Sequence, residues 1–183
     1  MSSERALSYD RYTYDDYIRW EAGFRCELID GIVYMMSAPS VWHQRVVKRL
    51  ATRLDSYLEG KKCESFIAPF DVRLFPKDNN SDDTVVQPDV IVVCDEKKVS
   101  DGLSCRGAPD VIFEVLSDST KSMDLLEKRR LYERAGVNEY WVIGKGYAIR
   151  WILDGGKYKE NKFNGGVNGI ELEKISLNIK FSI

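Results

Sequence analysis

Two carboxylates stand in short apolar segments that the sequence should place next to each other. Asp89 lies in the segment 85–93 and Glu114 in the segment 110–116, and both segments are rich in the β-branched residues typical of strands. The polar connection between them, 95–108, is too short for a crossover helix, so the strands should pair antiparallel. That pairing would make Asp89 and Glu114 neighbours. Two carboxylates so placed offer oxygen ligands that suit a hard divalent cation.

A third carboxylate, Asp110, competes for this role because it shares a predicted strand with Glu114. It lies four residues earlier, which at ~3.3 Å per residue separates the two by roughly 13 Å, too far to share one ion. Asp89 is therefore the preferred partner, and Asp110 is expected to begin its strand. Asp89 has a structural alternative, since Asp is common beside turns. Glu114 interrupts an apolar stretch, where a buried carboxylate needs a partner.

A cation held by Asp89 and Glu114 would suit hydrolysis of a phosphodiester bond. Such an ion activates bound water and stabilises charge on phosphate oxygens, and a nearby lysine commonly supports the reaction. The strand offers none, because Leu116 stands two residues after Glu114. On the next helix, Lys128 has apolar neighbours at helical spacing, which favours an inward direction. The alternative is an exposed pair with Asp124 worth ~0.3–0.5 kcal/mol.

Four other residues are candidates for contacts with a substrate. Glu27 starts a predicted hairpin and has two interpretations, an outer carboxylate near the metal or an exposed strand residue. His43 is the only histidine, and a lone histidine is more often structural than catalytic. The substrate-contacting set that we expect is Glu27, His43, Gln87 and Lys121.

The charge balance limits the kinds of partner. The net charge is −2, which argues against a protein that coats nucleic acid without specificity but leaves room for a local basic groove. One such surface is the outer face of the helix expected at 40–58, which carries Arg45, Lys48, Arg49 and Arg53. Basic side chains in a row can follow a phosphate backbone. Charged helix faces are usually only hydrated, so this stripe predicts little by itself.

The composition is that of a soluble globular chain, with 44% hydrophobic and 31% charged residues. A length of 183 residues is most simply one domain, 1–183. No apolar run approaches the ~20 residues of a membrane span, and no signal peptide is recognisable. The scattered cysteines lack metal-ligand spacing. We therefore expect reduced thiols rather than disulfides, in a cytoplasmic protein; these residues are Cys26, Cys63, Cys94 and Cys105.

Local signals predict a mixed α/β chain. The strongest is the Asp30-Gly31 turn of a hairpin within 26–36. Ser40 should cap a long helix that ends near Leu58, and Gly136 should end a second helix that begins at Ser117 or Ser119. Strands are also expected at 66–74, 138–143, 147–152, 157–163 and 170–183. The order predicts one central mixed sheet flanked by helices, with extra β-hairpins.

Several blocks of the chain resemble, in order, those of the Uma-type restriction-endonuclease family. The most diagnostic block is Gly107-Ala108-Pro109-Asp110-Val111-Ile112-Phe113-Glu114-Val115-Leu116-Ser117. The others are Glu27-Leu28-Ile29-Asp30-Gly31, His43-Gln44, Ala68 to Leu74, Gln87-Pro88-Asp89, and Asp124 through Trp141. The resemblance covers nearly the whole chain, although the C-terminal third matches only loosely.

The resemblance implies a restriction-endonuclease-like fold of the PD-(D/E)XK superfamily and metal-dependent cleavage of nucleic acid. It implies that Asp89, Glu114 and the backbone carbonyl of Val115 bind Mg²⁺, or Mn²⁺ in its place. It also implies that Lys128 replaces the strand lysine of the superfamily. One departure is Gly144, where most relatives carry an aspartate.

The same resemblance sets the expected partners. They are nucleic acid, most simply DNA, and a second copy of the chain in a homodimer. The alternative is a catalytically idle, nuclease-derived module that binds nucleic acid or a protein, or that serves oligomerisation. Fold analogy alone does not separate these functions.

Overall fold

The computed structural model describes residues 10–20, 24–116 and 123–164. Its helical elements are α1 (Tyr14–Tyr17), α2 (Val41–Leu58), the 3-10 turn η1 (Glu96–Val99), the π-helical turn η2 (Met123–Lys128) and α3 (Arg129–Ala135). Its strands are β1 (Cys26–Ile29), β2 (Ile32–Met35), β3 (Glu64–Ile67), β4 (Asp71–Arg73), β5 (Val85–Val86), β6 (Val90–Val93), β7 (Ser104–Arg106), β8 (Val111–Val115), β9 (Glu139–Gly144), β10 (Tyr147–Asp154) and β11 (Lys157–Asn164).

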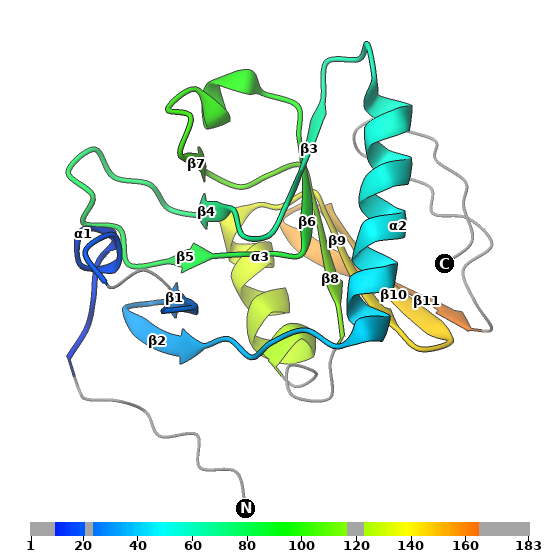
Figure 1. Ribbon diagram of the computed structural model, residues 1–183, viewed down its shortest axis with the longest axis horizontal. Coiled ribbons are helices and arrows are strands. Elements are labelled where there is room, and N and C mark those ends of the chain that lie inside the picture. The colour runs from blue at the N-terminus through cyan, green and yellow to red at the C-terminus, as the bar shows by residue number, and fades with distance from the viewer. Residues whose placement is uncertain (1–9, 21–23, 117–122, 165–183) are drawn as a thin grey trace, which may run out of the picture.

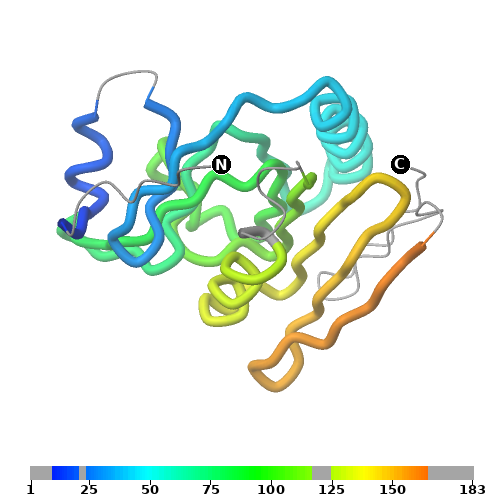
Figure 2. The backbone as a smooth tube through the Cα atoms, turned by 90° about the horizontal axis from the view of Figure 1, so that it is seen from below, coloured from blue at the N-terminus to red at the C-terminus, as the bar shows by residue number. Residues whose placement is uncertain are grey.

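The predicted mixed sheet forms, and a second, smaller sheet lies beside it (Figure 1). One has the order β2-β1-β5-β4-β7, and the other has the order β11-β10-β9-β8-β6-β3. The hairpin of β10 and β11 forms the outer edge of the larger sheet, on the opposite side of the molecule from α1 (Figure 2). Both sheets mix parallel and antiparallel pairs, so the α/β class is confirmed.

The second sheet arises because two expected strands are each divided by a proline. The segment 66–74 splits at Pro69 into β3 and β4, and the segment 85–93 splits at Pro88 into β5 and β6. Proline has no backbone N–H and interrupts a ladder of strand hydrogen bonds. In each case the two halves belong to different sheets. The residues Gln87 to Asp89 therefore cross from one sheet to the other.

The larger sheet is buried on both faces. Val90 and Val92 of β6 pack in the cluster that contains the apolar face of α2, whereas Ile91 and Val93 pack in the cluster that contains α3. This alternation follows from the two-residue period of a strand. The strand β8 pairs antiparallel with β6, with Val90 opposite Phe113, as the short connection predicts.

The long helix begins and ends where the sequence predicts. The Oγ atom of Ser40 accepts a hydrogen bond from the backbone N–H of His43 at 3.2 Å, which caps α2. Val46, Leu50, Leu54 and Leu58 are buried on its inner face, and Val47 packs against the same cluster while partly exposed. The helix is thereby anchored to the larger sheet along its whole length.

The expectation that all cysteines are reduced is wrong. Cys63 and Cys94 form a disulfide, whereas Cys26 and Cys105 are free and buried. Glu64 of β3 pairs with Val93 of β6, so the antiparallel register places the two flanking cysteines opposite each other. That proximity depends on strand pairing, which cysteine spacing alone does not reveal. The prediction of reduced thiols therefore holds only for Cys26 and Cys105.

Three expectations fall outside the described residues. They are the cap of the second helix at Ser117 or Ser119, the substrate contact of Lys121, and the edge strand at 170–183. The described end of that helix agrees with the prediction, because Gly136 adopts the left-handed conformation with φ of 83° directly after α3. Among the described residues, no helix has the length and apolarity that a membrane span requires.

Candidate active site

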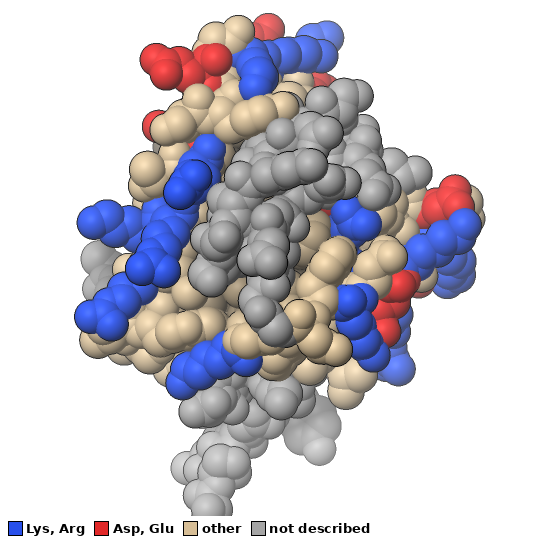
Figure 3. All heavy atoms as spheres, turned by 90° about the vertical axis from the view of Figure 1, so that its right-hand side faces the viewer, with Lys and Arg blue, Asp and Glu red and all other residues tan. Residues whose placement is uncertain are grey.

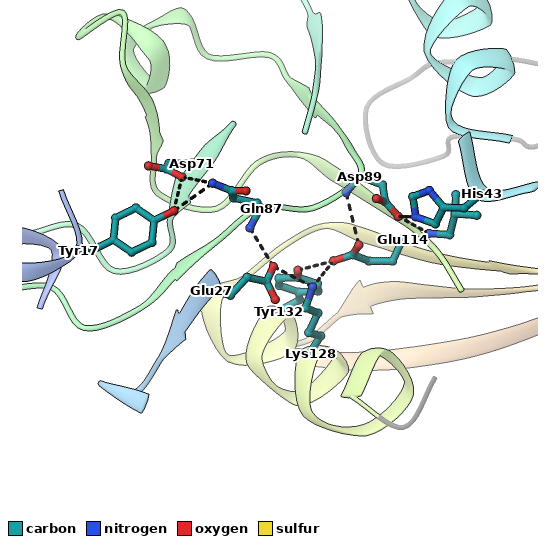
Figure 4. Close-up of polar contacts among 10 residues, drawn as sticks. Tyr17, Glu27, His43, Asp71, Gln87, Asp89, Glu114, Lys128 and Tyr132 are labelled. Atoms are coloured by element: carbon teal, nitrogen blue, oxygen red, sulfur yellow. Dashed lines mark hydrogen bonds and ion pairs between the residues drawn. The ribbon is translucent and has the colours of Figure 1, made fainter. Parts of the chain in front are cut away.

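The two predicted carboxylates meet where the two sheets join (Figure 4). Oε2 of Glu114, on β8, accepts a hydrogen bond from the backbone N–H of Asp89 at 3.4 Å. Oδ2 of Asp89, just before β6, accepts a hydrogen bond from the backbone N–H of Val115 at 2.7 Å. Each side chain thus contacts the backbone beside the other. The antiparallel pairing of β6 and β8 brings Asp89 and Glu114 together, as the strand arrangement predicts.

The lysine at the site comes from the helix. Nζ of Lys128 lies 2.8 Å from Oε1 of Glu114, and the hydroxyl of Tyr132 donates to the same oxygen at 3.0 Å. Lys128 ends η2, and Tyr132 lies one turn later in α3 on the same face. Turns of π-helix frequently occur at functional sites, where they change the direction of side chains. Lys128 is only 5% exposed, so it points into the protein.

Glu27 is the second carboxylate that holds Lys128. Its Oε1 lies 2.9 Å from Nζ of Lys128 and accepts the backbone N–H of Gln87 at 2.9 Å. The interpretation of Glu27 as an exposed strand residue is wrong, because its exposed fraction is 5%. All four residues of β1 are buried, so both faces of this strand are covered, in addition to its two edges, which pair with β2 and β5.

The donor set of this site fits a magnesium-like cation. Glu27, Asp89 and Glu114 bring three carboxylates against the one ammonium of Lys128, and a divalent cation would balance the two excess negative charges when all are ionised. The N–H and the carbonyl of one strand residue point to the same side, and the Val115 N–H points to Asp89, so strand geometry places the Val115 carbonyl on that side as well.

The described residues contain no group of three or more His, Cys, Asp or Glu side chains arranged around a metal position. An ion here would therefore combine two carboxylates, a carbonyl and water, which is the pattern that Mg²⁺ accepts.

A second polar cluster lies beside the first and was not foreseen from the sequence. The side-chain nitrogen of Gln87 donates to Oδ1 of Asp71 at 2.9 Å and to the hydroxyl of Tyr17 at 3.0 Å. That hydroxyl donates to the same oxygen of Asp71 at 3.0 Å. Burial and the Asp71 charge raise the pKa of Tyr17, so its phenol stays protonated and remains a donor. Gln87, an expected substrate contact, is thus bonded to other protein groups by both its backbone and its side chain.

Asp110, which competed with Asp89 as a metal ligand in the sequence, has a different partner. Oδ2 of Asp110 accepts the backbone N–H of Cys94 at 2.8 Å, so Asp110 stabilises the loop at the start of β8.

At Gly144, where the sequence departs from the family pattern, a Cβ atom would meet the ring of Tyr147. An aspartate there would therefore require the Tyr147 ring to move.

The basic residues of α2 lie on its outer face, away from the carboxylates. Arg45, Lys48, Arg49 and Arg53 are exposed. Within the described residues none of the four has a carboxylate partner. Lys and Arg side chains follow one another down the left side of the face that Figure 3 shows, with acidic side chains near its upper end. The other residue of this helix that we expected to contact substrate, His43, lies on the buried side.

Comparisons with known proteins agree with this architecture. A family model described as "Uma2: Putative restriction endonuclease" matches residues 14–182. The chain belongs to the Uma2 family. The resemblance that the sequence motifs suggested is therefore confirmed.

Two individual proteins extend the comparison. An uncharacterized protein of Synechocystis sp. is 31% identical over 122 residues, which are 64% of this chain; the match spans 60% of that relative's length. A crystal structure of a protein from Anabaena variabilis, described as a "putative nuclease belonging to DUF820", superposes with a TM-score of 0.71. It covers 92% of this chain and 94% of its own at 14% identity, a likeness that shows the fold alone. The predicted restriction-endonuclease-like fold class is confirmed.

Sequence reasoning missed three polar residues, Tyr17, Asp71 and Tyr132. A signal for Tyr132 did exist, because it lies one helical turn after Lys128 on an inward stripe and a buried tyrosine hydroxyl needs a partner. No comparable signal linked Tyr17 to Asp71, which lie 54 positions apart in different elements.

Proposed function

We propose that this Uma2 protein is a metal-dependent nuclease that hydrolyses phosphodiester bonds in DNA. The observation that carries the proposal is the convergence of Asp89 and Glu114 at Val115, with Lys128 bound to Glu114. Family membership supports the same class of reaction. Asp89, Glu114 and the Val115 carbonyl would hold Mg²⁺ or Mn²⁺. When bound, the ion would lower the pKa of a water ligand and offset charge on the phosphate.

The side chains around the carboxylates have distinct tasks in this proposal. Lys128, held between Glu27 and Glu114, presents a fixed positive charge that orients the attacking water and stabilises the developing negative charge on the phosphate. Tyr132 fixes one oxygen of Glu114 by its hydrogen bond. Because these donors are already in place, little reorganisation is required during the reaction.

The test is a cleavage assay on purified protein with plasmid DNA, linear duplex, single-stranded DNA and RNA, in Mg²⁺, Mn²⁺ or chelator. We expect metal-dependent cleavage of DNA that Asp89→Asn and Glu114→Gln each abolish. Asp110→Asn is the matched control, since it alters a carboxylate on the same segment whose hydrogen bond, among the described residues, is to the Cys94 backbone.

Two outcomes would contradict this proposal. Cleavage that persists in Asp89→Asn would place the reaction elsewhere. Absence of cleavage with every substrate and both metals, together with retained DNA binding, would instead support the idle binding module.

A further inference from the structure

Only one of the two carboxylate oxygens of Asp89 is hydrogen-bonded among the described residues. Its Oδ2 accepts two hydrogen bonds, from the Val115 N–H at 2.7 Å and from Nε2 of His43 at 3.0 Å. Among the described residues its Oδ1 has no polar partner. We infer that His43 is a positioning residue. Its hydrogen bond occupies Oδ2 of Asp89 and so leaves Oδ1 as the oxygen available to a metal ion. This inference rests on the metal site of the proposed function.

The position of His43 is set by the whole of α2. Its backbone N–H is bonded to the capping Ser40, and its ring is on the same buried face as Val46, Leu50 and Leu54. It is the only polar side chain among the buried residues of the helix. The 18-residue helix is anchored in the core of the larger sheet, so the imidazole reaches Asp89 from a rigid support.

The contact with Asp89 determines which nitrogen carries the proton. An ionised carboxylate only accepts hydrogen bonds, so Nε2 must be the protonated nitrogen of the neutral ring. In that tautomer Nδ1 is a bare acceptor, and within the described part of the chain it is buried without a hydrogen-bond partner. A buried polar atom without a partner costs free energy and is rare in native proteins. A leucine would avoid this cost, so the histidine is better explained by its bond to Asp89 than by packing.

The same geometry argues against two other roles. Nδ1 is inaccessible and Nε2 is occupied by Asp89, so neither nitrogen is placed to accept a proton from water or to contact a phosphate. His43 therefore acts through Asp89 and not on the substrate, which differs from the substrate contact that we expected. Partners that orient metal-binding side chains typically contribute about 10- to 100-fold to metal affinity.

Isothermal titration with Mn²⁺, without nucleic acid, tests this role on the full chain. His43→Leu removes the donor but keeps an apolar side chain, whereas His43→Gln retains an amide N–H that can reach Asp89. We expect Mn²⁺ affinity to fall about 10- to 100-fold in His43→Leu and to stay within a few-fold of wild type in His43→Gln. Melting of the metal-free proteins supplies the second readout. There His43→Leu should melt close to wild type, because removal of the unpaired Nδ1 offsets loss of the hydrogen bond to Asp89.

Equal Mn²⁺ affinity of His43→Leu and wild type would overturn the inference while leaving the metal site intact. Equal weakening in both variants would also overturn it, because the donor would then not be the decisive feature. Failure of wild type to bind Mn²⁺ would be a different result, since it would remove the proposed metal site itself and the role of His43 with it. The melting curve detects a variant that does not fold. In that case the Mn²⁺ affinity of the other variant, compared with wild type, tests the inference.

Discussion

The ammonium group of Lys128, at the end of η2, lies 2.9 Å from a carboxylate oxygen of Glu27, a residue 101 positions earlier in the chain and in the smaller sheet. The same group lies 2.8 Å from Glu114. A buried cation between two carboxylates is sensitive to the loss of any member, because an unpaired charge would then remain inside the protein. This relationship ties the smaller sheet to the candidate active site.

Replacement of Glu27 by Gln should leave an acceptor for the Gln87 N–H but remove one of the charges that hold Lys128. We expect the cleavage rate to fall by about 10- to 100-fold, with Mn²⁺ affinity close to wild type because Glu27 is not a proposed ligand. Cleavage rate and Mn²⁺ titration measure the two effects. Asp30→Asn, which changes a half-exposed acid of the same hairpin that pairs with Arg134, is the control. Unchanged cleavage in Glu27→Gln would mean that Glu114 alone positions Lys128.

Replacement of Lys128 by Met should abolish cleavage and also destabilise the metal-free protein. Without the ammonium, Glu27 and Glu114 remain as buried carboxylates that lack their cation, and breaking such a buried pair costs about 3–5 kcal/mol. Urea unfolding measures the loss. The exposed Arg130→Met in the same helix should change stability by less than about 0.5 kcal/mol. Similar behaviour of the two variants would refute the assignment of Lys128.

Asp89→Asn should remove stabilisation by metal. Without metal, this variant should be at least as stable as wild type, because it relieves an excess of negative charge at the site. Mn²⁺ at about 100 times its Kd should stabilise wild type by about 2.7 kcal/mol and should add little to the variant. Thermal melts with and without metal measure both effects, with Asp110→Asn as the control. Equal stabilisation of Asp89→Asn and wild type would locate the ion elsewhere.

The buried thiol of Cys26 should make stability depend on alkaline pH. Burial, followed by the charges of Asp71 and Glu27, raises the pKa of Cys26 from 9.0 to about 11. The folded protein thus holds this proton more tightly than the unfolded chain, so the contribution is complete below pH 9 and is lost as the pH rises toward 11.

Unfolding free energies measured across that range should fall less steeply in Cys26→Ala than in wild type. An identical pH dependence in the two proteins would show that the thiol titrates as it does in the unfolded chain.

The outer face of α2 should contribute electrostatically to DNA binding. Each phosphate neutralised contributes a slope of about −0.9 to log K against log salt concentration, so the triple change Arg45→Gln, Arg49→Gln, Arg53→Gln should reduce the slope by about 2–3. Fluorescence anisotropy in the Asp89→Asn background gives the slope without cleavage. The control replaces three exposed lysines of β11 that already have carboxylate partners, Lys157, Lys159 and Lys162. If the α2 variant leaves the slope unchanged, these basic side chains do not contact DNA phosphates and are simply hydrated.

Local sequence signals determined the elements that carry the candidate site. Ser40 predicted the start of α2, and two β-branched segments joined by a short loop predicted the pairing of β6 with β8. The proximity of Asp89 to Glu114 followed directly, because register within a hairpin depends only on the chain between its strands. The inward direction of Lys128 was favoured by its apolar neighbours but not decided by them.

Only the tertiary structure decided what surrounds that pair. The contacts of Glu27 with Lys128, of His43 with Asp89 and of Tyr17 with Asp71 each join elements that no hairpin connects. They depend on how two sheets and α2 pack, and side-chain periodicity specifies which face is buried but not which element covers it. The Cys63–Cys94 disulfide has the same origin, since its cysteines meet only when β3 pairs with β6. The sequence alone determined the hairpin that carries the two acids, whereas the packing of distant elements completed the site around them.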